Sequence, residues 1–471
     1  MHRTWQRSIA CAGALLLIIT CFLRYGGVLA DAESAEWEVY QDAVYYIVTA
    51  QNEVTIKGAR PSVTEAEIPA ELDGCPVTEI AEYAFKDCTR LRRVSLPDSV
   101  QRIGEFAFMN CTRLTELVIP DTVAQIGGGT ARGTPWLTSQ TEDFVIAGQG
   151  ILLAYLGSET CAAVPDGVRS IGGYAFDSST VQQVTLPASV QSIDGFAFVN
   201  CSSLQKLELS DGLERIGQYA FHWCTALTEI QIPHTVKTVG NHAFSYCRSL
   251  RRVSLSAQLT QISSAMFQGC SALEEIELPD RVTMIANLAF DGCIMLQKLV
   301  LPETVEEIGT GAFSGCTGLR WLLVLNPACR ISDTRQTLPD TVPVSSYIDS
   351  TAHVFSRKYA HRFLPLDRRC GDINGDQEVN AADVSLLLTY CAKTGAGISV
   401  TWDDIAQYCS DYDENSVINA ADASALLVCI AREGVGFSEL KSEEWRMEKG
   451  VLLHAEEEVE TDRSVSDGLL S

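Results

Sequence analysis

A phenylalanine that returns about every 23 residues constrains the fold of this chain more than any other feature of its sequence. An alanine precedes it in eight places and a methionine in one. The nine positions are Phe85, Phe108, Phe176, Phe198, Phe221, Phe244, Phe267, Phe290 and Phe313, and the successive spacings are 23, 68, 22, 23, 23, 23, 23 and 23. A constant period of this length indicates that one supersecondary unit is copied along the chain, with one interruption.

Each unit also carries a cysteine and a strand pattern at fixed positions. The segment Leu91, Val94 and Leu96 follows the L-x-x-L-x-L strand pattern of leucine-rich repeats. The strand ends at Pro97, because proline has no N–H to donate to a sheet. A cysteine lies three residues after eight of the nine phenylalanines, and Ser179 replaces it after the other. The eight are Cys88, Cys111, Cys201, Cys224, Cys247, Cys270, Cys293 and Cys316.

A single unit of this kind cannot bury its apolar face alone, whereas units stacked about 4.8 Å apart share a continuous core. We therefore predict a repeat solenoid, a β-rich α/β leucine-rich-repeat array, over residues 78–325. Residues 31–77 are expected to form an N-terminal cap, and residues 326–366 a C-terminal cap with a short helix around His353 to His361. The pattern from about Val39 to Leu366 resembles the BspA-like leucine-rich-repeat family, because phenylalanine, cysteine and proline recur together at fixed positions of the repeat. That resemblance implies a strand on one side of each unit and a short strand with a single helical turn on the other.

Residues 134–156 interrupt the period. There, two apolar runs, Phe144 to Ala147 and Ile151 to Tyr155, flank the turn-forming segment Gly148-Gln149-Gly150. Two such runs around a glycine-rich turn predict a β-hairpin inserted in the array.

The cysteines and histidines of the array favour structural roles. Residues at one phase stack in a column, so we expect buried reduced thiols, although disulfides between units about 4.8 Å apart are geometrically allowed. A straight column does not converge on a tetrahedral metal ion. His222 lies near Cys224, but it occupies a position that is structural in the other units of the repeat. We therefore expect a turn or core residue rather than one half of a catalytic Cys/His pair. The sequence contains no H-E-x-x-H, no G-x-S-x-G and no glycine-rich phosphate loop, so we predict no enzyme activity.

One exposed column of the predicted strands alternates in charge from unit to unit. Its members are Arg93, Glu116, Gln183, Lys206, Glu229, Arg252, Glu275 and Lys298. Neighbours of opposite charge are expected to pair across the strands, each pair contributing about 0 to 1 kcal/mol. We expect this surface to recognise a protein or a surface polymer, which the sequence does not name.

The N-terminus predicts export. Arg3 and Arg7 precede an apolar run from Ile9 to Leu23 and then small residues, which is the layout of a signal peptide over residues 1–30. Lipoprotein cleavage before Cys21 and an uncleaved anchor are the alternatives, and no second membrane-length apolar stretch follows. The formal charge of −25 argues against nucleic acid or an anionic membrane as partner.

The segment 370–434 contains a duplication with an offset of 39 residues. In each copy, oxygen-bearing residues occupy loop positions 1, 3, 5, 9 and 12, with a backbone carbonyl expected at position 7, and this spacing wraps a calcium ion in EF-hand loops. The first predicted ligand set is Asp372, Asn374, Asp376, Glu378, Asn380 and Asp383, and the second is Asp411, Asp413, Asn415, Val417, Asn419 and Asp422. The apolar runs that follow each loop predict helices, so two calcium ions and a small all-α domain are expected.

Two such loop-helix units resemble a type I dockerin, the module that binds cohesin domains of cellulosome scaffolds. By that resemblance, the cohesin-facing residues are Ala381, Ala382, Ala420 and Ala421, and either helix could dock. Residues 435–471 form an acidic tail, for which we expect disorder or a loose helix.

These features together predict a secreted, non-catalytic protein that joins a scaffold through its dockerin and serves polysaccharide degradation indirectly. A free-standing cell-surface adhesin is the first alternative. A carbohydrate-active hydrolase is the second, and it would need two carboxylates about 5 to 9.5 Å apart in a cleft.

Overall fold

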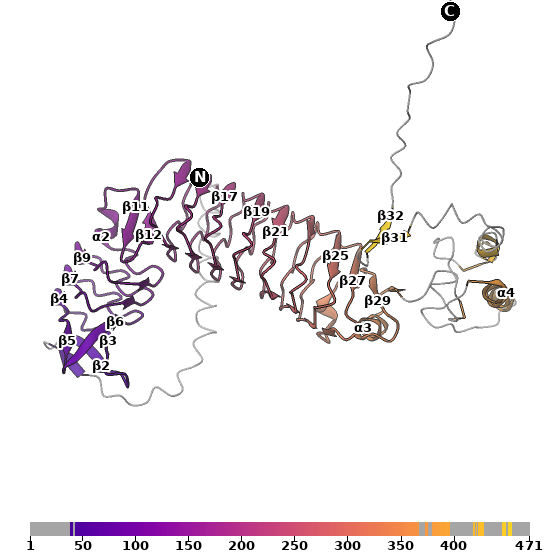
Figure 1. Ribbon diagram of the computed structural model, residues 1–471, viewed down its shortest axis with the longest axis horizontal. Coiled ribbons are helices and arrows are strands. Elements are labelled where there is room, and N and C mark those ends of the chain that lie inside the picture. Colours follow the sequence, from indigo (N-terminus) through magenta and orange to yellow (C-terminus); the bar gives the residue numbers. More distant parts are fainter. Residues whose placement is uncertain are drawn as a thin grey trace, which may run out of the picture.

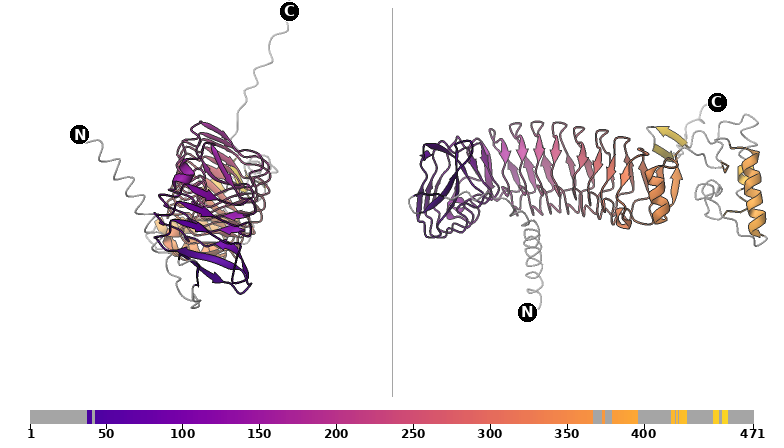
Figure 2. Two further views of the ribbon diagram at one scale, coloured as in Figure 1. Left: turned by 90° about the vertical axis from the view of Figure 1, so that its left-hand side faces the viewer. Right: turned by 90° about the horizontal axis from the view of Figure 1, so that it is seen from below.

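The computed structural model describes residues 38–40, 43–366, 373–374, 379–395, 418–419, 421, 423–427, 445–448 and 451–454. The predicted signal peptide lies outside these residues. Over residues 43–366 the chain winds into an elongated solenoid whose strands lie side by side in successive units (Figures 1 and 2). The predicted repeat architecture is confirmed.

The N-terminal cap begins with an antiparallel meander and then turns into the first parallel pairs of the array. Strand β3 pairs antiparallel with β2 and parallel with β6, which carries the sheet into the repeats. The cap strands are β1 Glu38–Tyr40, β2 Val44–Val48, β3 Val54–Ala59, β4 Glu65–Glu67, β5 Glu71–Leu72 and β6 Cys75–Ile80.

Each unit contributes one strand of two to four residues to one side of the solenoid, which we call the long-strand face, and one two-residue strand to the other side. The strands of the long-strand face are β7 Arg93–Ser95, β9 Glu116–Val118, β13 Cys161–Ala163, β15 Gln183–Thr185, β17 Lys206–Glu208, β19 Glu229–Gln231, β21 Arg252–Ser254, β23 Glu275–Ile276, β25 Lys298–Leu301 and β27 Trp321–Val324. The short strands are β8 Arg102–Ile103, β10 Gln125–Ile126, β14 Ser170–Ile171, β16 Ser192–Ile193, β18 Arg215–Ile216, β20 Thr238–Val239, β22 Gln261–Ile262, β24 Met284–Ile285, β26 Glu307–Ile308 and β28 Arg330–Ile331. All pairings between neighbouring units of one ladder are parallel, for example Arg93 with Glu116.

Consecutive β-turns, rather than the implied helical turn, connect the short strand to the next long one. In one unit, Met109 N–H donates to the Phe106 carbonyl and Cys111 N–H to the Phe108 carbonyl. Phe106 and Asn110 have φ values of 53° and 59°. Left-handed residues at these two phases interrupt any right-handed helix, which explains the difference from the expectation.

The periodic phenylalanines form the core that the spacing predicts. All nine rings are fully buried, and they stack on one another on each side of the insertion. Neighbouring centroids are 5.2 Å apart for Phe85 and Phe108 and 4.6 Å apart for Phe176 and Phe198. Burying a ring of this size in each unit supplies roughly 2 to 3 kcal/mol of transfer free energy.

The cysteine column is buried and reduced, and all twelve cysteines of the described residues are free. Each thiol from the second unit onward bonds to the preceding unit: Cys111 Sγ donates to the Phe85 carbonyl over 3.0 Å, and Cys224 Sγ to the Phe198 carbonyl over 3.2 Å. Burial raises the pKa of Cys111 to about 12, so this thiol is inert at neutral pH.

The predicted hairpin insertion is present. After the short helix α2 Pro135–Thr138, strands β11 Phe144–Ala147 and β12 Ile151–Tyr155 pair antiparallel, and β12 pairs parallel with β14. On the long-strand face, β9 closes the sheet β4-β7-β9 and β13 opens a new one. The insertion therefore divides the array into two blocks.

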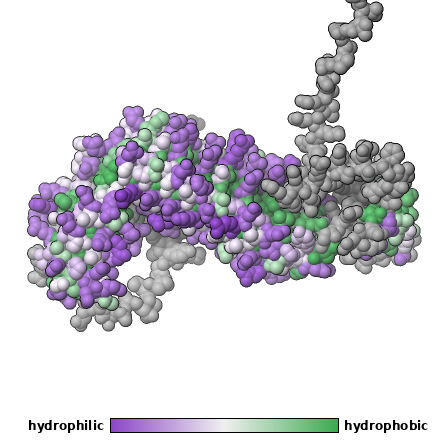
Figure 3. All heavy atoms as spheres, in the orientation of Figure 1, coloured by the Kyte–Doolittle hydropathy of each residue, from purple (hydrophilic) through white to green (hydrophobic). Residues whose placement is uncertain are grey.

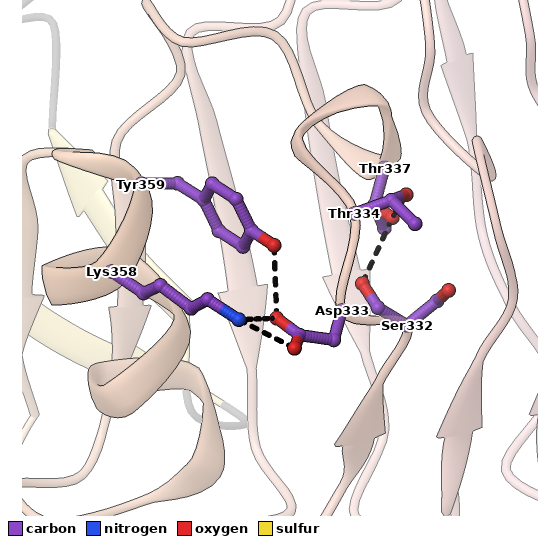
Figure 4. A network of polar contacts seen from close by, with 6 residues as sticks. All are labelled: Ser332, Asp333, Thr334, Thr337, Lys358 and Tyr359. Carbon is purple, nitrogen blue, oxygen red and sulfur yellow. Dashed lines mark hydrogen bonds and ion pairs between the residues drawn. The ribbon is translucent and has the colours of Figure 1, made fainter.

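The C-terminal cap contains η1 Arg335–Thr337, β29 Val344–Ser346, α3 Thr351–Tyr359 and β30 Phe363–Pro365. Helix α3 confirms the expected helix, and Ser350 begins it by accepting the His353 N–H. Figure 4 shows how α3 is tied to the last repeat: the Asp333 carboxylate accepts hydrogen bonds from Lys358 Nζ and the Tyr359 hydroxyl.

Beyond the cap, the structure describes helix α4 Ala381–Gly395 and strands β31 Trp445–Glu448 and β32 Val451–His454. The two strands form an antiparallel hairpin within the predicted tail, so the expectation of disorder or a loose helix is wrong there. In the sequence, Gly450 stands between the two apolar segments and was a turn signal that the sequence analysis missed. In the part of the chain that the structure describes, no helix has the length and apolar content needed to cross a membrane.

Candidate calcium module and recognition surfaces

Asp383 closes the first predicted calcium loop onto helix α4. Its Oδ1 accepts the N–H groups of Ile373 over 2.7 Å and Asn374 over 3.0 Å, and its Oδ2 accepts the N–H of Asn380 over 2.9 Å. The side chain is fully buried and lies in the first turn of α4, where the helix dipole favours a negative charge. The carboxylate thus joins the start of the loop to its end.

The two described residues at loop position 9 make the same local bond in both copies. Asn380 Oδ1 accepts the Ala382 N–H over 2.8 Å, and Asn419 Oδ1 accepts the Ala421 N–H over 2.7 Å. Such side-chain bonds to the N–H two residues ahead start helices. The structure therefore gives the duplicated loops the same connection to the helices that follow.

The other predicted ligands lie outside the described residues. They are Asp372, Asp376, Glu378, Asp411, Asp413, Asn415, Val417 and Asp422. Among the residues that the structure does describe, no three His, Cys, Asp or Glu side chains gather as a metal site. The donor set is made of carboxylate, amide and carbonyl oxygens, which suits a hard cation such as calcium.

The described helical residues of the module bury one side and expose another. The buried side chains are Val384 and Leu387 of α4 with Ala423 and Leu426 of the second copy, and they form one cluster with Ile373 and with Phe363 of the cap. Leu388 and Leu427 are half exposed and lie 39 residues apart, which is the offset of the duplication. Of the predicted cohesin-facing residues, Ala381, Ala382 and Ala421 are exposed, and Ala420 lies outside the described residues.

The charged column of the long-strand face is exposed and in the predicted register, but most of the expected pairs do not form. In the described array, Arg93 and Glu116 form the one ion pair of the column, at 3.6 Å. Lys206 pairs instead with Glu208 of its own strand, at 2.7 Å. Cross-strand pairing was thus wrong for most of the column, and for Lys206 the reason is a competing carboxylate on its own strand. Pairs across units do form on the short-strand side, between Arg102 and Glu79 and between Arg330 and Glu307. Figure 3 shows a mostly hydrophilic surface over the array.

His222 takes a structural place, as its repeat phase predicts. Its Nδ1 lies 2.6 Å from Ser245 Oγ, and Ser245 is fully buried and donates to the His242 carbonyl. Burial lowers the pKa of His222 to about 4, with a smaller contribution from His242. Cys224 bonds to a backbone carbonyl, so the neighbouring thiol and imidazole do not form a nucleophile pair.

A second ladder of aromatic rings runs along the β-turns that precede the core phenylalanines, and the sequence analysis missed it. Its members are Tyr83, Phe106, Tyr174, Phe196, Tyr219 and His242, all two residues before the core phase. Most of its neighbouring rings stack nearly parallel, for example Tyr174 on Phe196 at 5.2 Å and 3° and Tyr219 on His242 at 4.5 Å and 4°. Because these rings cover one another's faces, they present edges to solvent and offer no flat platforms for sugar rings.

Comparisons with known proteins agree with both parts of this architecture. The BspA type leucine rich repeat region matches in six copies over residues 62–139, 158–274 and 191–320, slightly more than half of the chain, and the dockerin type I domain matches residues 370–431. The gap between the first two repeat matches coincides with the hairpin insertion. No match is found among curated proteins.

Solved structures of bacterial leucine-rich-repeat proteins also match. A leucine rich repeat protein of T. pallidum is 32% identical over 38% of this chain and 90% of that chain, with a TM-score of 0.36. A leucine-rich repeat protein from Bacteroides ovatus is 20% identical over 70% and 99%, with a TM-score of 0.36. A leucine rich cell surface protein from Faecalibacterium prausnitzii is 22% identical over 65% and 97%, with a TM-score of 0.29.

Fold and matches together define a repeat solenoid joined to a calcium-binding docking module. More specifically, the chain belongs to the BspA-type leucine-rich-repeat family and carries a dockerin type I domain. Proteins with such dockerins are extracellular components of cellulosomes, and both families are binding rather than catalytic modules.

Proposed function

We propose that this protein is a secreted, non-catalytic component that docks onto a cohesin-bearing scaffold through residues 370–434 and displays the array of residues 78–325 as a recognition surface. The array would bind a protein or a surface polymer. Its part in polysaccharide degradation would be indirect, through enzymes held on the same scaffold.

The observation that carries the proposal is the equivalence of the two copies in the dockerin. Both copies bond the position-9 asparagine to the helix start, and both expose a leucine 39 residues apart. Each copy thus exposes a leucine and at least one alanine among its described helical residues, and exposed apolar side chains of this kind are ones that protein partners cover. We infer that either helix can meet the cohesin, through Leu388 with Ala381 and Ala382, or through Leu427 with Ala420 and Ala421.

Calcium would hold the loops through the two ligand sets named above, one ion in each. The three N–H donors fix Asp383 at the end of its loop, which pre-orients a position-12 ligand. Gln377 and Ser416 replace the glycine usual at position 6, which lowers the expected calcium affinity.

Calorimetric titration of the full chain against cohesins from the same source, with calcium and with chelator, tests the proposal. Cohesin binding is expected in the presence of calcium and not in the presence of chelator. It should be lost in the double variant Asp383→Ala, Asp422→Ala. The matched control Asp211→Ala, on an exposed array residue, should bind like the wild type. Absence of binding to every cohesin in calcium would contradict docking and favour a free-standing adhesin.

A further inference from the structure

The interior ring ladder lacks one member at the insertion. The position 23 residues after Phe108 is Ala131, which is buried at 4% exposure. In the same unit Thr134 stands where the cysteine belongs and Gly129 where the outer aromatic ring belongs. This unit therefore keeps the turns of the repeat but lacks its core phenylalanine, its cysteine and its outer aromatic ring.

The hairpin supplies a replacement ring only to the following unit. Tyr155 of β12 stacks on Phe176 with centroids 5.0 Å apart. Its N–H donates to the Ala175 carbonyl over 2.7 Å, as the Phe85 N–H does to the Ala107 carbonyl over the same distance. Tyr155 thus occupies the core phase. Among the described rings, the ladder remains broken between Phe108 and Tyr155.

A cavity of about 180 Å3, partly open to solvent, lies at this break. Its lining includes the apolar residues Ala131, Leu137 and Leu153 together with Tyr155. A cavity of about 150 Å3 left by removing one leucine from a protein core stays dry and binds benzene. The present cavity is therefore large enough for one aromatic ring with a small substituent.

The lining also contains a pair of opposite charges that compensate each other. Arg132 Nη2 lies 2.5 Å from Asp177 Oδ2, and the Arg132 guanidinium lies 5.0 Å from the centroid of the Tyr174 ring. The Asp177 side chain is only 16% exposed. Because the two charges compensate each other, a charged ligand gains little from them, whereas a hydroxyl can donate to the carboxylate.

We propose that this cavity is a binding site for a small uncharged phenol, whose ring takes the place of the missing core phenylalanine and whose hydroxyl meets Asp177. The proposal is independent of cohesin docking, because it rests on the array alone. It gives the insertion a role that the regular units lack.

The test is titration of the full chain with 4-methylphenol, followed by calorimetry and ligand-observed NMR. The wild type is expected to bind one equivalent saturably. Ala131→Phe, which restores the repeat pattern, and Leu153→Phe, which enlarges a second lining side chain, should each weaken binding at least tenfold. Val118→Phe adds the same side chain on the exposed side of the same unit and should stay within twofold of the wild type.

Far-UV circular dichroism and the thermal midpoint establish that each variant is folded, and two variants are used so that one misfolded protein does not decide the result. Lack of saturable binding by the wild type would overturn the proposal. Unchanged affinity in a folded cavity-filling variant would overturn it as well. Toluene, which lacks the hydroxyl, should bind several-fold more weakly, and equal affinity would reject the role of Asp177.

Discussion

The repeat array and the dockerin stabilise their folds by different means. In the array, the turns and thiols of one unit form hydrogen bonds to the neighbouring unit, and its aromatic rings stack on the rings of that unit. The units therefore stabilise one another through repeated contacts. The dockerin has a much smaller described core, and the ligand sets that we propose for its loops are rich in carboxylates, which would repel one another without a cation. The array is therefore expected to fold on its own contacts, whereas the module depends on bound ions.

Calcium removal should show this difference most strongly. Ligand binding at a thousand times Kd stabilises a folded state by about 4 kcal/mol, and chelation removes that contribution. With chelator, the backbone amides of α4 should lose most of their protection from hydrogen exchange, whereas those of the array should keep it. Loss of protection in the array on chelation would contradict the comparison.

Within the array, removing one ring from the middle of the core ladder should lower the free energy of unfolding by nearly as much. Phe244 lies 5.1 Å from the Phe221 ring and 5.8 Å from the Phe267 ring, and it is fully buried. Phe244→Ala is expected to cost about 3 to 5 kcal/mol in denaturant unfolding, because it leaves a cavity. Val354→Ala, at a side chain that is 63% exposed, is the control and should change stability by less than about 0.5 kcal/mol.

The array should also lose stability in acid through His222. Burial lowers its pKa from 6.5 to about 4 in the folded state, so the unfolded chain binds a proton that the folded chain does not. The titration of His222 leaves the free energy of unfolding unchanged above about pH 6.5. As the pH falls toward 4 it lowers that free energy, by about 2 kcal/mol near pH 5.

His222→Gln removes this titration. The difference in unfolding free energy between pH 7 and pH 5 should therefore shrink by about 2 kcal/mol in the variant. An unchanged pH dependence would show that the imidazole is not held neutral.

The smallest effect is expected on the long-strand face. Arg93 and Glu116 are about half exposed or more, and Glu116→Ala should change stability by less than about 1 kcal/mol. Added salt should erase the difference, since exposed pairs are screened. A larger, salt-independent loss would mean that Glu116 packs rather than pairs.

The sequence predicted those parts of the fold that depend on a hydrophobic side chain at a fixed spacing. The core phenylalanines belong to this group. The hairpin was instead predicted from two apolar runs around Gly148 to Gly150, and helix α3 was expected in the cap, where the period is lost. The outer aromatic ladder escaped because its phase accepts Tyr, Phe, His and even Gly129, so no single letter repeats.

Other features depend on three-dimensional packing that no local pattern contains. Tyr155 reaches the core phase only because its hairpin docks against β14. The charged column shows opposite signs in register, yet Lys206 meets the competing carboxylate of Glu208 on its own strand instead. For the candidate calcium site, spacing alone supplied the ligand sets, and the structure adds the bonds of Asp383, Asn380 and Asn419.

The thiol bonds between units bear on how such an array can change in length over evolution. Each regular unit brings one S–H donor for the unit before it and one phenylalanine carbonyl acceptor for the unit after it. A recombination event that deletes or duplicates a whole 23-residue unit therefore removes or adds one donor and one acceptor together, leaving none unmatched. Arrays of many lengths can arise in this way without any compensating substitution.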